Sequence, residues 1–429
     1  MNEKKKKIGF RLILTSLLLI PGLQTLFIIG SNSDYLIKFP IHIIVIVLTI
    51  LSIIGLIYGI KLFIDNKNAN KRKLRKWLKV VFTIFMSFYV AGCTFLIILL
   101  YGPNETFKTW LITTAMQTMD HQYYCKIFYN DIQIDEIMGK NYIEESGEST
   151  DKNLINKEEQ LVYNEYEKEI MEHEEGEPYK IITFEVNGAK AYLAAIYDPS
   201  KVKLQVTEQI GVIGEYVTNM AYRSNAIMAI NAGGFVDAGH NLGESPTGIT
   251  IKDKQIITNN EYGYATSTGG IIGMTDDDVL VLLKNTTAEE ALEMGVRDAV
   301  SWGPFLIVNG VASTVSGNGG WGGGARSAIG QRIDGTILFL VVDSNAIRTA
   351  GAGMEDLVQI MQRYGAYNAA NLDGGTSSVL AVRRDVAINK YGATCHDFYT
   401  RYACAINDPI DATGTHQTRY VADAWVVVE

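Results

Sequence analysis

With 429 residues, the chain is long enough for a membrane-embedded part and one sizeable folded domain. Its formal net charge of −9 is unevenly distributed, because Lys and Arg gather in the first 80 residues while Glu dominates residues 135–177. The acidic C-terminal part excludes nucleic acid as a partner, since nucleic-acid binding requires a basic face.

The N-terminal part contains three long apolar runs, at residues 8–30, 41–64 and 80–101. Each run can cross a bilayer, because a membrane-spanning helix needs about 20 apolar residues. The first run follows four lysines, which is also the pattern of a signal peptide. The two further runs favour three transmembrane helices within residues 1–104, with membrane lipid as their surroundings.

The charges of the loops predict the orientation of these helices. The segment between the second and third runs is rich in Lys and Arg, whereas the segment between the first two has only Asp34 and Lys38. Basic loops remain in the cytoplasm. We therefore expect a multi-pass protein of the cell membrane with a cytoplasmic N-terminus and everything after Tyr101 outside. A lipid-headgroup or nucleic-acid patch is the alternative reading of the basic loop, but topology alone explains it.

Two segments join the membrane part to the rest of the chain. Residues 105–140 carry apolar side chains at helical spacing, which predicts an amphipathic stalk or a helix at the membrane interface. Residues 141–178 are rich in Glu and have few aromatic residues, which predicts a solvated, partly helical linker.

Residues 179–429 form the predicted folded domain. Strands are expected at 181–186, 191–196, 201–207, 226–230, 249–251, 255–258, 271–274, 279–283, 299–308, 337–342 and 424–428. Helices are expected at 214–223, 288–294 and 354–364. Many strands and few helices predict a mixed α/β domain with a largely antiparallel sheet.

Several familiar catalytic patterns are missing from the sequence. It has no Walker A loop, no G-x-S-x-G elbow and no H-E-x-x-H motif, and its six histidines lack metal-binding spacing. No cofactor is required by the sequence. A divalent metal stays open, although the acidic run Asp276–Asp278 is more typical of a solvated turn. Cys395 and Cys404 are close enough in sequence to close a short loop as a disulfide, which is also left open.

Polar residues flanked by glycine follow several predicted strands. Arg326 comes after the glycine-rich run NGGWGGG, whose backbone amides could form a nest around an anion, and its guanidinium matches a phosphate. Asp373 and Asn231 each follow a strand and precede glycines. A solvated loop arginine and two Asx turns would explain each residue separately, but three such strand ends in one domain indicate a site.

The motifs around these residues resemble those of the phosphodiester glycosidase family over roughly residues 180–429. They are NAGGF (231–235), SPTGITI (245–251), SWGPFLIVNG (301–310), ARSAIG (325–330) and NLDGGTSS (371–378). The family usually has Thr where this chain has Ser327, and often Gly-Arg where this chain has Ser344-Asn345. The three-helix anchor resembles that of some Gram-positive bacterial members.

The resemblance implies hydrolysis of a sugar-1-phosphodiester at the anomeric bond, in cell-envelope polysaccharide or another glycoconjugate. Arg326 would hold the phosphate with the amides of the glycine loop, and Asp373 would activate water or stabilise an oxocarbenium-like centre. Asp343 or Glu244 would be the partner of Asp373. The expected substrate-binding set is Asn231, Gly233, Gly234, Gly324, Ser327, Asn371, Gly374, Gly375, Thr376 and Ser377.

Two other functions compete with this one. The domain could be a non-catalytic module that binds anionic envelope polymers, which would need Arg326 but no carboxylate at Asp373. It could also be a membrane-bound accessory subunit of exopolysaccharide assembly, with envelope-assembly proteins as partners.

Overall fold

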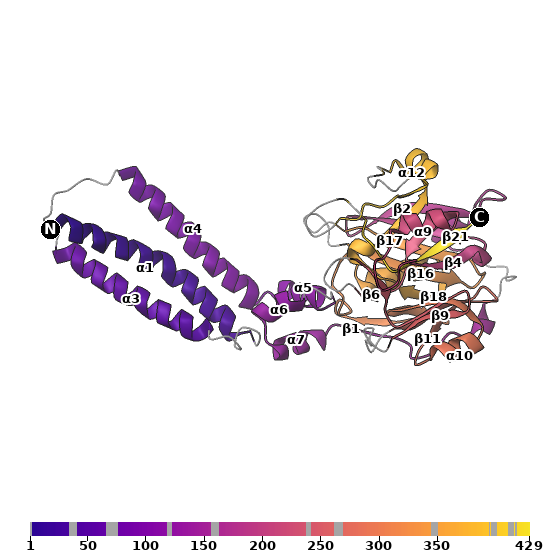
Figure 1. Ribbon diagram of the computed structural model, residues 1–429, viewed down its shortest axis with the longest axis horizontal. Coiled ribbons are helices and arrows are strands. Elements are labelled where there is room, and N and C mark those ends of the chain that lie inside the picture. Colours follow the sequence, from indigo (N-terminus) through magenta and orange to yellow (C-terminus); the bar gives the residue numbers. More distant parts are fainter. Residues whose placement is uncertain are drawn as a thin grey trace. The chain divides into compact units, whose positions relative to one another are not determined.

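The chain forms two compact units, Met1–Lys140 and Asn141–Glu429, each of which is described by itself. The computed structural model (Figure 1) describes residues 2–33, 41–65, 76–117, 122–155, 163–236, 242–260, 269–344, 351–393, 395, 401–410, 416 and 418–429.

Three long helices make up most of the first unit: α1 (Asn2–Ser31), α3 (Ile41–Asp65) and α4 (Lys76–Tyr101). Their apolar stretches Lys4–Ser31, Ile43–Asp65 and Thr83–Tyr101 are long enough to cross a membrane, as predicted. Small residues let α1 and α3 approach closely, because a Cβ added to Gly9 would lie 2.7 Å from the carbonyl oxygen of Gly59.

The amphipathic segment that follows forms three short helices, α5 (Glu105–Met116), α6 (Gln122–Phe128) and α7 (Asp131–Met138). Ile112, Cys125 and Ile134 from these helices are buried in a common cluster. The apolar stripe that suggested a single stalk helix is therefore satisfied by packing within the first unit.

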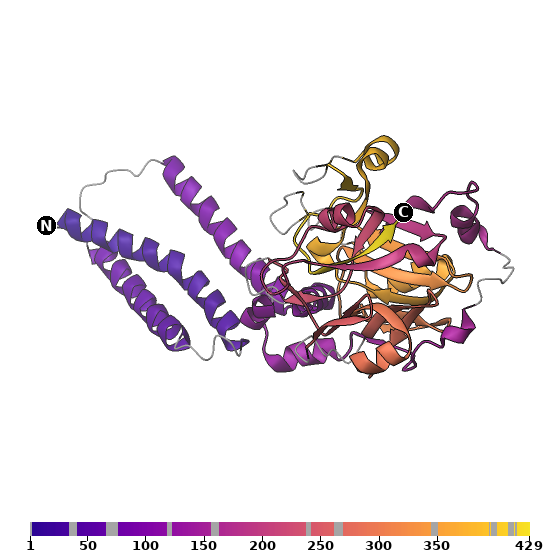
Figure 2. The same cartoon turned by 45° about the vertical axis from the view of Figure 1, so that its right-hand side comes forward.

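Antiparallel sheets dominate the second unit, in agreement with the predicted class (Figures 1 and 2). The largest sheet has the order β14-β13-β18-β16-β17-β3-β2. Its strands are β14 (Val311–Ala312), β13 (Phe305–Val308), β18 (Ala366–Asn371), β16 (Arg326–Arg332), β17 (Ile337–Val342), β3 (Ala189–Ile196) and β2 (Tyr179–Val186).

Two five-stranded sheets complete the framework, in the orders β20-β19-β5-β21-β4 and β11-β10-β12-β8-β9. The strands of the first are β20 (Ala403–Ala405), β19 (Leu380–Arg383), β5 (Ala226–Asn231), β21 (Asp423–Val428) and β4 (Val202–Val206). Those of the second are β11 (Leu280–Leu283), β10 (Gly270–Thr275), β12 (Val296–Trp302), β8 (Ile249–Lys252) and β9 (Gln255–Asn259).

Short helices lie outside these sheets: α9 (Val217–Arg223), α10 (Ala288–Glu293), α11 (Met354–Arg363) and α12 (Arg384–Tyr391). The predicted helices at 214–223, 288–294 and 354–364 correspond to the first three.

The inner strand β17 is buried on both faces, which explains its unbroken apolar sequence ILFLVV. Phe339 and Val341 point into a core shared with the two five-stranded sheets. Leu338 and Leu340 point to the opposite side, where they pack with Leu357 of α11. The alternation of side chains along one strand thus joins two cores.

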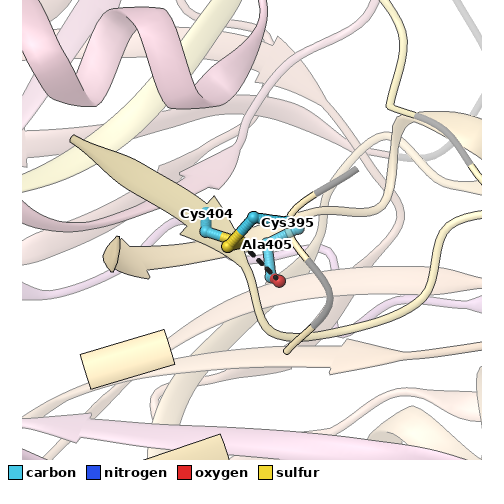
Figure 3. Close-up of a disulfide and its surroundings, with 3 residues drawn as sticks. All are labelled: Cys395, Cys404 and Ala405. Atoms are coloured by element: carbon cyan, nitrogen blue, oxygen red, sulfur yellow. Dashed lines mark hydrogen bonds between the residues drawn. A yellow bond between two sulfur atoms is a disulfide. The ribbon is translucent and has the colours of Figure 1, made fainter. Parts of the chain in front are cut away.

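A disulfide joins Cys395, which follows α12, to Cys404 in β20, with the two Cα atoms 5.6 Å apart (Figure 3). Cys404 is buried, and its sulfur lies 3.6 Å from the carbonyl oxygen of Ala405. The pairing that the sequence left open is present in this fold.

The described part of residues 141–171 folds onto the second unit, which corrects the interpretation of 141–178 as a solvated linker. We call residues 141–155 and 163–171 the strap. Its β1 (Tyr142–Glu144) pairs with β15 (Thr314–Ser316), and the side chain of Ile170 in α8 (Glu165–Met171) is fully buried. The abundant Glu residues lie mainly on the solvated side and conceal the few apolar anchors.

Buried charges also attach the strap. Glu145 accepts hydrogen bonds from the backbone N–H groups of Gly269 (2.7 Å) and Phe305 (2.6 Å). Glu167 contacts the buried Arg332 at 3.0 Å, at the far end of β16 from Arg326. An unpaired buried guanidinium would be costly, so these ion pairs bind the strap to the sheet.

We therefore predict that Ile170→Ala lowers the free energy of unfolding of the second unit by about 2–5 kcal/mol, through lost burial and a residual cavity. Calorimetry or denaturant titration of the full chain in detergent measures this. Ile210→Ala is the matched control, because Ile210 is 42% exposed, and it should change stability by less than about 0.5 kcal/mol. Equal effects of the two substitutions would show that the strap does not contribute to folding.

Candidate active site

Four strand ends meet where the largest sheet adjoins the sheet that contains β5. The loop after β18 crosses from one sheet to the other, and the N–H of Leu372 donates to the carbonyl of Ser327 (2.8 Å). The next N–H, of Asp373, donates to the carbonyl of Ala232 (3.0 Å), whose own N–H donates to the carbonyl of Asp423 (3.3 Å). Asp373, Ala232 and Asp423 therefore lie in a row, with Arg326 beside Asp373.

The amide of Asn231, at the end of β5, binds these strand ends together. Its Nδ2 donates to the carbonyl of Asp373 (2.7 Å), while its Oδ1 accepts from Ser327 Oγ (2.7 Å) and from the N–H of Val379 (3.1 Å). Asn231 and Ser327 were predicted to contact substrate. The structure instead engages their polar atoms with each other and with the backbone.

The guanidinium of Arg326 is held by carbonyl oxygens. Its Nη2 donates to Trp321 (2.6 Å) and Gly322 (3.2 Å), and its Nε donates to Ala352 (3.3 Å). Nη1 has no hydrogen bond to the described residues and lies beside Gly374, whose added Cβ would be 3.3 Å away. One nitrogen of the guanidinium, Nη1, is thus left to bind a ligand.

This arrangement corrects the predicted role of the glycine-rich loop. Because the C=O and N–H of one peptide unit point in opposite directions, the amides that follow the carbonyls of Trp321 and Gly322 point away from the guanidinium. The backbone N–H of Gly324 is also engaged, by the carbonyl of Ala352 (3.2 Å). The loop orients Arg326 and does not form an amide nest around the same anion.

Arg326 and Asp373 influence each other electrostatically. Burial lowers the pKa of Arg326 to about 10, against the opposing effect of the Asp373 carboxylate, so the guanidinium stays charged at neutral pH. Burial raises the pKa of Asp373, opposed by a hydrogen bond from Ser377, the charge of Arg419, the N–H of Gly374 and the charge of Arg326. A carboxylate and a cation that are both partly removed from water can bind and activate a ligand.

The two predicted partners of Asp373 differ in their surroundings. Asp343, just after β17, accepts from Asn407 Nδ2 (2.9 Å) and from the N–H of Asp408 (3.2 and 3.1 Å). Its carboxylate therefore anchors the segment at Asn407, which itself binds the loop after Asp373 through the carbonyl of Ser378 (2.8 Å). Glu244 is half-buried just before β7 (Ser245–Pro246), and its part in the site stays a prediction.

The remaining predicted residues surround Asp373 in different ways. Asn371 is buried and donates to the carbonyl of Gly303 (2.8 Å). The backbone N–H of Gly375 donates to the carbonyl of Ala325 (2.8 Å), and the side chain of Thr376 is partly exposed without a described hydrogen bond. Of the predicted side chains, Thr376 is thus the one most open to a ligand.

Gly234 packs directly against the indole ring of Trp302. A Cβ added to Gly234 would lie 2.0 Å from the indole ring of Trp302, so a side chain there would displace the ring. Trp302 in turn meets Trp321 edge-to-face, with ring centroids 6.3 Å apart, and Trp321 stacks on the Arg326 guanidinium at 5.8 Å. Two partly exposed indoles therefore border the cation, as aromatic rings do in many carbohydrate and anion sites.

Residues 224–428 match the family model of the phosphodiester glycosidases. This match supports the resemblance that the motifs carry. A curated relative, the SPbeta prophage-derived uncharacterized protein YomE of Bacillus subtilis (strain 168), is 30% identical over 175 residues, which is 39% of this chain. The match spans 26% of the length of that relative.

Some solved structures are also similar to this chain, at lower sequence identity. The catalytic domain of zebrafish N-acetylglucosamine-1-phosphodiester alpha-N-acetylglucosaminidase, auto-inhibited by its pro-peptide, is 17% identical, with a TM-score of 0.44 over 60% of this chain and 85% of that one. A hypothetical protein from Synechocystis is 16% identical, with a TM-score of 0.36 over 58% of this chain and 61% of that one.

Two charged residues of the matched region escaped the sequence analysis. Asp423 begins β21 and is buried, with Oδ1 accepting from the N–H of Gly233 (2.7 Å). Arg419 is partly exposed, lies over the ring of Phe235 at 4.9 Å and interacts electrostatically with Asp373. Neither residue is flanked by a glycine motif; a charged residue at the start of an otherwise apolar strand was the only indication of Asp423.

The acidic run Asp276–Asp278 pairs with cations of the second unit. The three carboxylates contact Lys254 (2.7 Å), Lys152 (3.4 Å) and Arg297 (3.3 Å), in that order. Among the described residues, no group of three or more His, Cys, Asp or Glu side chains could hold a metal ion. His240, the histidine nearest NAGGF in sequence, lies outside the described residues.

We predict that Asn231→Ala destabilises the second unit by about 2–4 kcal/mol, because two donors, on Ser327 and Val379, lose their acceptor and a buried unmade hydrogen bond costs about 1–3 kcal/mol. Thermal unfolding of the full chain in detergent checks this. Asn259→Ala, at an exposed position at the end of β9, is the control and should be within about 0.5 kcal/mol of the parent chain. A stable Asn231→Ala variant would contradict the clamp role of this amide.

Proposed function

We propose that this chain hydrolyses the anomeric bond of a sugar-1-phosphodiester in a polysaccharide or glycoconjugate of the cell envelope. The observation that carries the proposal is the pairing of Arg326 with Asp373 at the junction of two sheets, within the region that matches the phosphodiester glycosidase family. A phosphate is a good leaving group, so the site needs a cation for the phosphate and a carboxylate for the sugar side of the bond.

In this proposal, Nη1 of Arg326 binds a phosphate oxygen, because the other nitrogens of the guanidinium already donate to carbonyl groups. Arg419 adds a second positive charge on the side of Asp373. Asp373, held by Ser377 and by the N–H of Gly374, activates water or stabilises the developing positive charge at the anomeric carbon. Thr376 is placed to bind a sugar hydroxyl or phosphate oxygen.

The proposed organisation has a membrane anchor at residues 1–104, a helical segment at 105–140 and a catalytic unit that begins at 141. We place the catalytic unit outside the cell, with the N-terminus and the basic loop inside. The excess of Lys and Arg between the second and third helices supports this orientation. The Cys395–Cys404 disulfide also supports it, because disulfides persist in oxidising compartments.

The reaction is tested by incubating the full chain in detergent with a panel of UDP-sugars and nitrophenyl glycosides, with and without a chelator. We expect release of the free sugar, since the proposed break is at the anomeric carbon. Release of the sugar phosphate would mean cleavage of another bond. Binding of anionic envelope polymers without any turnover would favour a non-catalytic module, and stoichiometric capture of an assembly complex would favour an accessory subunit.

We predict that Asp373→Asn leaves the fold intact and lowers turnover by about 10²–10⁴-fold, the usual contribution of a positioned acid–base group. The measurement is kcat on the best substrate of the panel, with thermal unfolding as the check of folding. Asp253→Asn, at an exposed turn, is the matched control and should keep full activity. Unchanged turnover in the Asp373 variant would remove this residue from the mechanism.

The orientation gives a further prediction. Alkaline phosphatase fused after Glu429 should be active in cells, because it folds only outside the cytoplasm, whereas a fusion within the basic loop at 66–75 should be inactive. Green fluorescent protein at the same positions should show the opposite pattern. Active phosphatase in the basic loop would reverse the topology.

A further inference from the structure

Asp423 is the buried carboxyl group that the proposed reaction leaves without a role. Its Oδ1 accepts from Gly233, whereas its Oδ2 is buried and has no hydrogen-bond partner among the described residues. An ionised carboxylate seldom leaves a buried oxygen unsatisfied, because removing its charge from water is costly. The geometry of Asp423 is therefore that of a neutral acid.

The neighbours of Asp423 determine what its charge would do. Asp373 and Asp423 are both joined to Ala232 by backbone hydrogen bonds, so the two residues are neighbours in the fold. Asp373 is the titratable group that acts on Asp423. Arg326 and Arg419 act in turn on Asp373.

We propose that Asp423 tunes the affinity of this site for anions: while Asp423 is neutral, the charge of Arg326 is available to a phosphodiester monoanion, and ionised Asp423 adds a negative charge that repels the same ligand. This inference rests on the proposed function for the identity of the anion, but its test does not require turnover.

The pH range follows from the surroundings of Asp423. Burial raises its pKa from 3.8 to about 7, and the nearby charge of Asp373 raises it further, against the lowering effect of the Gly233 hydrogen bond. Arg326, with a pKa of about 10, stays charged across this range. Anion affinity is therefore expected to fall as the pH rises through about 7.

Binding of diethyl phosphate tests this directly, because this phosphodiester keeps one negative charge from pH 5.5 to 8.5. We expect its Kd for the full chain in detergent to rise by about tenfold over this range, as one added charge within several ångströms implies at an effective dielectric constant near 20, with some screening by salt. The Kd of a neutral methyl glycoside should not change over the same pH range. A pH-independent Kd for diethyl phosphate in the parent chain would overturn the proposal.

Asp423→Asn is the decisive variant, because the amide keeps the shape of the carboxyl group but never carries its charge. Its Kd for diethyl phosphate should remain at the low-pH value throughout. Asp298→Asn is the matched control, since Asp298 in β12 is also a buried carboxyl group but both of its oxygens accept hydrogen bonds, from the N–H of Asp253 and from Arg297, and it should keep the parental pH dependence. Parental pH dependence in Asp423→Asn would assign the effect to another group.

The stability of the fold provides a second, ligand-independent measurement. Because Asp423 binds its proton more tightly in the folded chain, the unfolding free energy should fall as pH rises from about 4 to about 7 and then level off. Asp423→Asn should make this fall smaller without removing it, because burial also raises the pKa of Asp373 and of Asp343. If the fall is as large in the variant as in the parent chain, Asp423 is already ionised at low pH and the inference fails; if no substrate turns over while both pH effects are present, only the proposed reaction fails.

Discussion

The amide of Asn231 is the interaction on which the site depends. One side chain satisfies the carbonyl of Asp373, the hydroxyl of Ser327 and the N–H of Val379, which belong to two segments that are both far from Asn231 in sequence. An amide supplies a donor and an acceptor at fixed geometry, so this one side chain can make all three bonds at once. It fixes the ends of strands from two different sheets relative to each other. The positions of the charged groups follow from that arrangement.

The charge of Arg326 is stabilised in this site without being neutralised. Arg326 is removed from water, but three backbone carbonyl groups replace its hydration and Asp373 opposes its loss of charge. Carbonyl dipoles fixed in advance can hold a cation without neutralising it, which leaves its charge for a ligand. The two indoles of Trp302 and Trp321 restrict water beside it, so the remaining charge acts in a medium of lower dielectric constant.

Much of this fold could be predicted from the sequence. Continuous apolar runs such as ILFLVV correctly indicated buried strands. Glycine-flanked polar residues at strand ends correctly indicated that Arg326 and Asp373 lie close together. The direction of the peptides in the glycine loop could not be predicted, because a run of glycines permits either the N–H or the C=O groups to face the arginine. Asp423 reaches the cluster through strand pairing alone, and the strap was concealed by its Glu-rich composition around Ile143 and Ile170.

The strands that precede the family match have a consequence for how this protein can be divided. The match begins at residue 224, whereas β3 covers one side of β17 and β4 covers one side of β21. A fragment cut at the limits of the match would expose the unpaired backbone of two long, apolar strands. Such open edges recruit strands from other molecules. Such a fragment would keep the motifs but would undergo domain swapping and form fibrous aggregates.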